Sequence, residues 1–271
     1  MLGTEWPAEE AAALASAILR EYTGMGMAAQ LAFGERVPDA GAAARIEDAA
    51  VRAAAGEPLQ YIFGYTEFCG HRIEVQPGVL IPRPETEEMT MMIIRGNAGF
   101  TGAVTDLCTG SGCIAVALSL AFPGASLTAT DFSDAALAVA RRNVGLTGAA
   151  VSLRKSDILT DEPSAVPLSD IIVSNPPYVT MREKAAMHRN VLDHEPHEAL
   201  FVPDDDPLLY YRAIAAVAET RLMPGGTVWL EVNENLAKDT AALFYGPLYR
   251  KVQVIHDIRG KERFVKSEKH G

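Results

Sequence analysis

The sequence from residue 104 to residue 115 reads Val104-Thr105-Asp106-Leu107-Cys108-Thr109-Gly110-Ser111-Gly112-Cys113-Ile114-Ala115. It joins an apolar strand to a glycine-rich turn and to the start of a helix. Gly110 and Gly112 let the backbone come close to a ligand, and the free amides at a helix start favour polar or anionic groups. Asp131 ends the next predicted strand about twenty residues later, where a carboxylate can accept hydrogen bonds from both hydroxyls of a ribose. The pattern predicts a site for a nucleoside cofactor at the edge of an α/β sheet.

Two classes of nucleoside cofactor fit this turn. The spacing Gly110-x-Gly112-x-x-Ala115, together with Asp131, matches the fingerprint of dinucleotide-binding enzymes and would make the chain an NAD-dependent oxidoreductase. Asp106 favours S-adenosylmethionine instead, because a carboxylate at the end of the first strand suits the cationic amino group of a methionine moiety. A pyrophosphate at the same place would be repelled by that carboxylate. We therefore predict an S-adenosylmethionine site, and an ordinary tight turn without a ligand is the alternative.

Strand and helix signals alternate from residue 103 to the C-terminus, which indicates a mostly parallel sheet covered by helices on both faces. Helices are predicted to begin after Gly112, at Ser133, near Pro207 and near Glu234. No helix separates the last two strands, so we expect them to form an antiparallel edge. The predicted strands are residues 103–108, 126–130, 151–154, 170–174, 227–232, 252–256 and 263–265.

The N-terminal part is rich in alanine and predicts a small bundle of helices. The sequence shows three helical patterns. The first begins after Pro7, the second covers residues 27–33 and the third covers residues 40–54. Residues 59–79 are instead rich in aromatic and β-branched side chains and predict a β-hairpin, followed by a proline-rich loop and a helix over residues 85–94. The expected parts are a helical substrate-docking domain (1–58), a β-hairpin and loop linker (59–84) and a catalytic domain (85–271).

Asn175-Pro176-Pro177-Tyr178 directly follows an apolar strand and carries the chemistry that we expect. An NH2 group on an sp2 carbon is a poor nucleophile. The Asn175 side-chain oxygen and the Pro176 carbonyl can accept both of its N–H groups and hold the nitrogen in line with a methyl donor. The prolines stiffen the backbone, and the Tyr178 ring can stack on a planar group. The tetrapeptide also occurs as an ordinary turn, but its position at the carboxyl edge of the sheet favours a catalytic site.

Length and charge narrow the class of substrate. The chain has 271 residues, a formal net charge of -11 and three cysteines, which are Cys69, Cys108 and Cys113. The acidic balance disfavours stable binding to nucleic acid, because duplex binding depends on neutralising phosphates. No apolar run approaches the roughly 20 residues that span a bilayer, and reduced thiols suit a cytoplasmic protein. We expect a cytoplasmic monomer that is not bound to membranes.

Two histidines near residue 195 resemble a metal-binding pattern only superficially. His194-Glu195-Pro196-His197-Glu198 is not the HExxH motif, and Pro196 would interrupt the helix that presents both imidazoles. We predict a solvated or substrate-lining loop there and no metal site.

Several segments together resemble the HemK/PrmC family, the N5-glutamine methyltransferases that modify the Gly-Gly-Gln loop of peptide chain release factors. The resemblance covers nearly the whole chain and is most specific in Pro82-Arg83-Pro84-Glu85-Thr86-Glu87 combined with the Asn-Pro-Pro-Tyr tetrapeptide. It implies a class I S-adenosylmethionine-dependent methyltransferase with a Rossmann-like seven-stranded sheet. It also implies a small N-terminal helical domain that recognises the release factor, and a β-hairpin linker. The segments that carry the resemblance are residues 56–64, 77–87, 106–115, 175–178, 195–196 and 199–200.

The residue patterns and the resemblance together give three sets of expected site residues. Asp157 follows the third predicted strand and is expected to meet the adenine edge while Ile158 packs on the adenine face, although a helix N-cap is the alternative for Asp157. The expected catalytic residues are Asn175, Pro176, Pro177 and Tyr178. The expected substrate-binding residues are the same four with Arg83 and Glu85. The expected cofactor-binding residues are Asp106, Cys108, Thr109, Gly110, Ser111, Gly112, Asp131, Asp157, Ile158 and Asn175.

Two positions depart from the family pattern. Cys108 takes the place of the first glycine of the turn, where a left-handed backbone would be less comfortable for a residue with a side chain. Asn233 takes the place of glycine in the family's Glu-x-Gly pattern. Neither change removes a group from the expected mechanism.

Two other functions remain open beside glutamine methylation. Adenine carries the same kind of NH2 group, so an adenine-N6 methyltransferase acting on DNA or RNA fits the tetrapeptide. Such an enzyme would need a flipped base and basic residues that hold the strand, which the acidic balance disfavours. A non-catalytic docking protein would keep the fold but would leave the complete polar site without a use.

Overall fold

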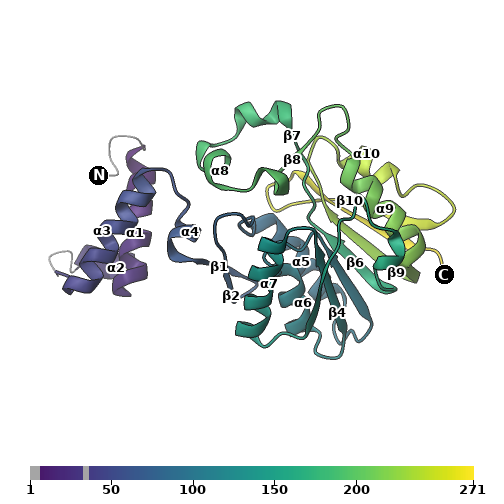
Figure 1. The fold of residues 1–271 in the computed structure, drawn as a ribbon, viewed down its shortest axis with the longest axis horizontal. Helices are drawn as coiled ribbons and strands as arrows, with labels where there is room; N and C mark the ends of the chain where they lie inside the picture. Colours follow the sequence, from purple (N-terminus) through teal and green to yellow (C-terminus); the bar gives the residue numbers. More distant parts are fainter. Residues whose placement is uncertain (1–6, 33–36) are drawn as a thin grey trace. The chain divides into compact units, whose positions relative to one another are not determined.

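The computed structural model describes residues 7–32 and 37–271, which form two compact units (Figure 1). One unit comprises the segment that ends at Tyr65 together with His188–His194, and the other comprises Thr66–Met187 together with Glu195–Gly271. None of the helices in these described ranges is long and apolar enough to cross a membrane.

The first unit is a bundle of helices, as predicted. Helix α1 ends at Gly24, which adopts a left-handed φ of 69°, and α3 begins after Asp39, whose side chain accepts a hydrogen bond from the Ala42 amide at 2.8 Å. The helical pattern predicted over residues 27–33 is confirmed to residue 32, while Phe33 lies outside the described residues. The core of the unit consists of Ile18, Ala49, Ala53 and Ile62. Its helices are α1 (Ala8–Thr23), α2 (Met27–Ala32), α3 (Ala40–Ala54), α4 (Leu59–Phe63) and α8 (Arg189–His194).

The predicted hairpin is shorter than expected, because residues 59–63 form helix α4 and not a strand. Pro58 precedes this helix, where a missing amide costs nothing, and Gly64 ends it with a left-handed φ of 79°. Ile62 is buried in the core of the helical unit, so tertiary burial overrides the β-propensity of the aromatic and branched side chains. The hairpin itself is limited to β1 (Tyr65–Phe68) and β2 (His71–Glu74).

The second unit is built on a seven-stranded sheet with the order β10-β11-β9-β6-β3-β4-β5. The strands from β9 to β5 are parallel, and β11 runs antiparallel to both β9 and β10. This arrangement confirms the predicted parallel sheet with an antiparallel edge. The strands of the sheet are β3 (Ala103–Leu107), β4 (Ser126–Asp131), β5 (Val151–Lys155), β6 (Ser169–Ser174), β9 (Leu222–Glu231), β10 (Tyr249–His256) and β11 (Glu262–Lys269).

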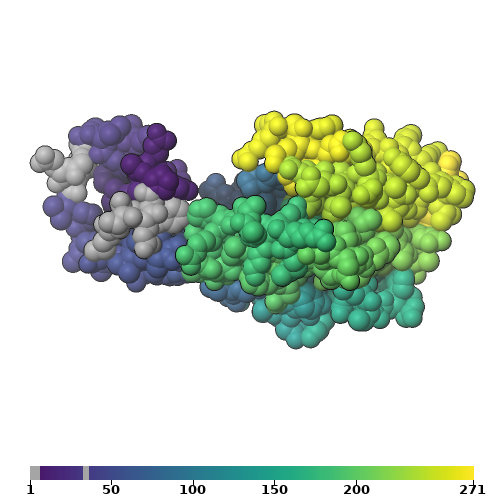
Figure 2. All heavy atoms as spheres, turned by 90° about the horizontal axis from the view of Figure 1, so that it is seen from above, coloured from purple at the N-terminus to yellow at the C-terminus, as the bar shows by residue number. Residues whose placement is uncertain are grey.

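Helices cover both faces of the sheet and enclose two apolar cores (Figure 1). Met89 and Leu118 belong to one core, and Tyr211 and Phe244 belong to the other. Helix α6 is buried from its first residue through Ser119, because its sequence is apolar on all sides. In Figure 2 the green segment that follows β6 lies at the surface. The helices of this unit are α5 (Pro84–Gly96), α6 (Cys113–Ala121), α7 (Asp134–Thr147), α9 (Leu209–Arg221) and α10 (Ala237–Ala242).

The side chain of Asn143 ties helix α7 to two neighbouring segments. Its Nδ2 atom donates to the carbonyl of Glu74 at 3.0 Å and to the carbonyl of Ser111 at 2.8 Å, and its Oδ1 atom accepts from the amide of Glu74 at 2.7 Å. Asn143 is fully buried, so these bonds replace water that the three backbone groups would otherwise need. The side chain holds both the hairpin and the glycine-rich turn against α7.

Replacing Asn143 with alanine should lower the free energy of unfolding by about 2–4 kcal/mol, because three backbone groups lose their partner at a buried site. Urea denaturation followed by circular dichroism measures this loss. Asn97→Ala is the matched control, since the half-buried Asn97 makes one side-chain hydrogen bond, to the Ile93 carbonyl. Equal losses in the two variants would contradict the role assigned to Asn143.

Candidate active site

The glycine-rich turn predicted between β3 and α6 is present, and its backbone is left-handed at three positions. Cys108, Gly110 and Gly112 have φ angles of 58°, 56° and 81°. A Cβ atom at Gly112 would lie 3.1 Å from the Ala140 Cβ atom, so close packing on α7 also favours glycine there. Cys108 meets the same backbone requirement with a side chain present, at a cost of roughly 1–2 kcal/mol.

Asp131 links this turn to the end of β4. Its Oδ2 atom accepts a hydrogen bond from the Gly110 amide at 2.8 Å, and its Oδ1 atom accepts one from the Ser133 amide at 2.9 Å. Burial raises the pKa of Asp131, and these amides oppose that shift. Because each carboxylate oxygen has a second lone pair, the side chain keeps acceptor capacity for ligand hydroxyls.

Asp106 lies beneath the turn and lines neither of the two hollows that meet at Asn175. Its side chain is 0% exposed, and its Oδ2 atom accepts a 2.5 Å hydrogen bond from the Thr109 hydroxyl. Burial raises the pKa of Asp106 to about 7. The hydrogen bond to Thr109 lets Asp106 stabilise the turn. Asp106 is absent from the lining of both hollows, so the predicted contact with a methionine amino group stays a prediction.

The Asn-Pro-Pro-Tyr tetrapeptide begins where β6 ends, as predicted. Leu107 of β3 pairs with Ser174 of β6, so Asn175 follows the sheet at the same level as Cys108. Both prolines are buried. The amide of Tyr178 donates to the Leu200 carbonyl at 3.2 Å, and β7 (Val179–Thr180) then pairs with β8 (Phe201–Val202). The tetrapeptide is therefore held at both ends.

Two adjoining hollows meet at Asn175. The larger contains about 530 Å³ of space between atoms and the smaller about 280 Å³, and both volumes include space open to solvent. Leu80, Asn175 and Ala199 border both hollows. Of the expected site residues, the larger hollow is lined by Cys108, Gly110, Asp131, Asn175 and Pro177. The smaller is lined by Arg83, Asn175, Pro176 and Tyr178.

The other expected site residues lie outside both linings. Asp157 accepts a hydrogen bond from the Leu159 amide at 3.0 Å, which stabilises a local turn. Ile158 packs against the core that contains α9 and α10. Glu85 lies near the buried Glu231. The residues outside both linings are Glu85, Asp106, Thr109, Ser111, Gly112, Asp157 and Ile158.

Sequence reasoning missed two aromatic residues that line the larger hollow, Phe132 and Tyr210. Phe132 directly follows Asp131 and is 43% exposed. Its position after the second predicted strand could have identified it as a site residue from the sequence. Tyr210 lies near the start of α9, and no local pattern connects it with the turn after β3.

Arg83 is engaged in an ion pair with Glu195, at 2.6 Å between Nη2 and Oε1. The other Glu195 oxygen accepts a hydrogen bond from the Ile81 amide at 3.2 Å. The pair fixes the proline-rich loop beside the smaller hollow, so Arg83 both lines this hollow and holds its wall. Residues 7–32 and 37–271 contain no group of three or more metal-ligating side chains suited to hold an ion.

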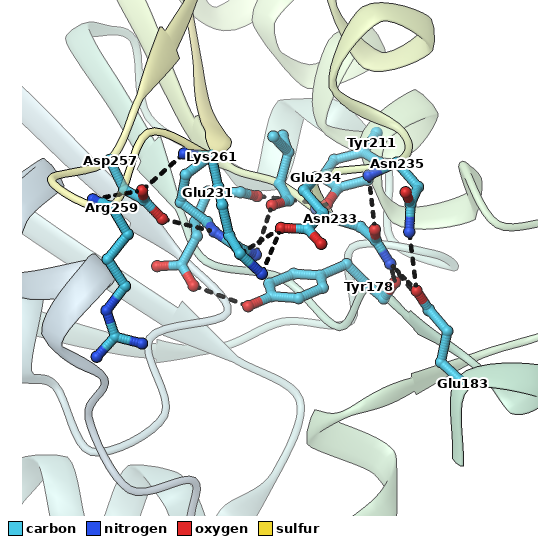
Figure 3. A network of polar contacts seen from close by, with 12 residues as sticks. Tyr178, Glu183, Tyr211, Glu231, Asn233, Glu234, Asn235, Asp257, Arg259 and Lys261 are labelled. Carbon is cyan, nitrogen blue, oxygen red and sulfur yellow. Dashed lines mark hydrogen bonds and ion pairs between the residues drawn. The ribbon is translucent and has the colours of Figure 1, made fainter. Parts of the chain in front are cut away.

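Asn233, the second departure from the family pattern, links neighbouring segments through hydrogen bonds of its side chain (Figure 3). Its Nδ2 atom donates to the Tyr178 carbonyl at 3.3 Å and to the Glu183 carboxylate at 2.9 Å and 3.0 Å. Its Oδ1 atom accepts from the Asn235 amide at 2.9 Å. The Asn233 side chain therefore stabilises the backbone at Tyr178.

The left-handed backbone at residue 108 predicts an order of stability between two variants. Cys108→Gly should be about 1 kcal/mol more stable than Cys108→Ala, because glycine adopts a positive φ without a Cβ clash. Thermal and urea unfolding of both variants measure the difference. The same pair of substitutions at Cys113, inside α6, is the control and should give the opposite order, since glycine weakens a helix. The same order at both positions would refute the explanation.

The sheet order and the site at the carboxyl edge define a class I methyltransferase fold. A crystal structure of a methyltransferase from Pyrococcus furiosus has a TM-score of 0.53 and 20% identity, over 84% of this chain and 98% of that chain, which supports the fold alone. Residues 88–199 match the family Methyltransferase small domain, and residues 7–64 match the PrmC N-terminal domain.

Curated relatives narrow this class to one family. The release factor glutamine methyltransferase of Bacteroides thetaiotaomicron is 46% identical over 220 residues, which cover 81% of this chain and 79% of the relative. That of Flavobacterium psychrophilum is 42% identical over 214 residues, which cover 78% of this chain and 75% of the relative. The chain belongs to the release factor glutamine methyltransferase family.

Proposed function

We propose that this chain transfers a methyl group from S-adenosylmethionine to the side-chain amide N5 of the glutamine in the Gly-Gly-Gln loop of peptide chain release factors. Membership in the family supports both the reaction and the substrate. The single structural observation that carries the proposal is the place of Asn175, which borders both hollows at the carboxyl end of β6. A methyl donor in one hollow and an amide in the other would meet at this residue.

S-adenosylmethionine is the methyl donor, and its sulfonium supplies the electrophilic methyl group. The residues that line the larger hollow have the chemistry to hold it. Asp131 offers acceptors to the ribose hydroxyls, and Phe132 and Tyr210 offer aromatic faces to the adenine. The left-handed turn at Cys108 and Gly110 brings the backbone close to the ligand.

The chain's own contribution to the reaction is orientation. The Oδ1 atom of Asn175 and the carbonyl of Pro176 accept the two N–H groups of the substrate amide, which holds the nitrogen in line with the methyl group. With the methyl donor bound, the N–C bond would form as the C–S bond breaks. The nitrogen would then carry a positive charge, and its acidic proton would leave to water without a strong general base.

A protein substrate agrees with the formal net charge of -11, whereas adenine in a nucleic acid would require neutralised phosphates. An adenine-N6 activity would use the same contacts at Asn175 and is the outcome to test if the protein substrate fails. We further propose that the protein acts as a monomer on the release factor.

Asn175→Ala should lower the methyl-transfer rate at least about 100-fold, since the amide nitrogen loses one of its two acceptors. Intact-mass and peptide mass spectrometry of an unmodified release factor incubated with the protein and S-adenosylmethionine measures the transfer. The expected product carries one methyl on the Gly-Gly-Gln glutamine. Asn97→Ala, remote from both hollows, should remain active. If the release factor remains unmethylated after incubation although calorimetry demonstrates cofactor binding, the substrate assignment is wrong.

Asp131→Ala should instead weaken S-adenosylmethionine binding, by about 10- to 100-fold in Kd, because charge-assisted hydrogen bonds to the ribose are lost. Isothermal titration calorimetry measures this Kd. Asp134→Ala is the control, since Asp134 lies three residues further on and forms an exposed ion pair with Lys155. An equal loss of cofactor affinity in Asn175→Ala would contradict the separate roles of Asn175 and Asp131.

A further inference from the structure

The NH2 group of Asn175 and the hydroxyl of Tyr178 are connected through one buried carboxylate, that of Glu231 at the end of β9. Glu231 is 1% exposed. Its Oε2 atom accepts a 2.6 Å hydrogen bond from the Thr86 hydroxyl. Its Oε1 atom accepts a 2.9 Å bond from the Tyr178 hydroxyl (Figure 3). The Thr86 oxygen in turn accepts a 3.0 Å bond from Asn175 Nδ2.

We propose that Thr86 and Glu231 are positioning residues that determine which end of the Asn175 carboxamide faces the substrate. The inference rests on the proposed function, in which the Asn175 oxygen accepts an N–H group of the substrate amide. It adds two residues that touch neither cofactor nor substrate but act through Asn175.

The orientation of the Asn175 carboxamide follows from the polarity of the hydrogen bonds around it. A carboxamide has nearly the same shape at its oxygen and its NH2 end, so the choice between the two orientations depends on hydrogen-bond partners. An ionised Glu231 has no hydrogen to donate, so Thr86 must donate its one hydroxyl hydrogen to the carboxylate. The Thr86 oxygen then acts only as an acceptor towards Asn175 and selects its NH2 group.

The orientation has a direct consequence for the substrate. With NH2 bound to Thr86, the Asn175 oxygen is directed away from Thr86 and can accept from the substrate amide. In the opposite orientation, the NH2 group of Asn175 would face the NH2 group of the substrate, and neither could accept. Thr86 and Asn175 are 89 positions apart in sequence, so this polarity is set by the packing of α5 against β9, which brings Thr86 to the residue that follows β6.

The charge state of Glu231 is part of the arrangement. Burial raises the pKa of Glu231, its two hydroxyl partners and Arg263 on β11 lower it, and Glu85 on α5 raises it. Tyr211 on α9 donates to the Glu231 carbonyl at 3.4 Å and stays neutral, because burial raises its own pKa. Because the pKa of Glu231 is raised, the carboxylate takes up a proton at a higher pH than an ordinary glutamate. A protonated Glu231 has a hydrogen to donate, and Thr86 is then free to reverse its polarity.

The first test removes the Thr86 hydroxyl while keeping its shape. Thr86→Val should lower kcat by about 10- to 100-fold with the Kd of S-adenosylmethionine unchanged, and Thr86→Ser should restore most of the rate. Thr90→Val is the matched control, because Thr90 is equally buried one turn later on α5 and its hydroxyl bonds only the Thr86 carbonyl. Equal losses of kcat in the Thr86 and Thr90 variants would overturn the proposal.

The second test changes the polarity at Glu231. Glu231→Gln supplies an NH2 group, so one of the two hydroxyls must accept. Its kcat should be reduced by about 10-fold or more. In the wild-type protein kcat should fall as the pH falls through the Glu231 pKa, and this acid limb should be absent in Glu231→Gln. Glu234→Gln, which removes a charge three residues further on, should keep the acid limb. An acid limb that persists unchanged in Glu231→Gln would overturn the proposal.

A third measurement separates failure of this inference from failure of the proposed function. In the protein labelled with ¹⁵N-asparagine, the Asn175 NH2 group should give one shifted pair of resonances, identified by its loss in Asn175→Ala. Thr86→Val should shift this pair and Thr90→Val should leave it unchanged. If wild-type protein does not methylate a release factor but the pair responds in this way, the positioning role stands and the substrate assignment fails. If Thr86→Val leaves the pair unchanged, the positioning role is refuted whatever the substrate.

Discussion

The parallel pairing of β3 with β6 is the constraint on which the candidate site depends. Leu107 pairs with Ser174, and the Ser174 hydroxyl donates to the Leu107 carbonyl at 2.7 Å. Because the two strands run in the same direction, they end at the same edge, and the residues that follow them, Cys108 and Asn175, border one hollow. On the other side of β3, β4 ends at Asp131, whose carboxylate accepts an amide of the glycine-rich turn. Three short segments far apart in sequence thus become one site.

Buried carboxylates hold this edge together. Burying an ionised group raises the free energy of the folded state unless the group is paired. Each of these carboxylates therefore needs hydrogen-bond or ion-pair partners. Asp106 accepts a hydrogen bond from the Thr109 hydroxyl, and Glu195 forms an ion pair with Arg83. Glu231 accepts hydrogen bonds from two hydroxyls. One partner each of Glu195 and Glu231 lies more than a hundred positions away in sequence, at separations of 112 for Arg83 and 145 for Thr86. These directional contacts join the proline-rich loop to the segment at Glu195 and join α5 to the end of β9.

The two departures from the family pattern show how a site tolerates change. Cys108 keeps the left-handed backbone that a glycine would adopt more easily, so the shape of the turn is retained. Asn233 adds contacts to the Tyr178 carbonyl and to Glu183, behind the residues that border the smaller hollow. Both changes leave the polar groups at Asn175 and Asp131 in place.

The sequence by itself determined the alternation of strands and helices, the antiparallel edge and the position of the Asn-Pro-Pro-Tyr tetrapeptide, because these follow from local periodicity and from turn residues. It misread residues 59–63, since burial in the helical unit outweighs β-propensity there. Only the tertiary structure decided that Phe132 and Tyr210 line the larger hollow, while Asp106 and Ile158 line neither hollow and Ile158 packs against an apolar core. Local patterns say which residues end a strand, but which side chains face a shared hollow depends on how remote elements pack.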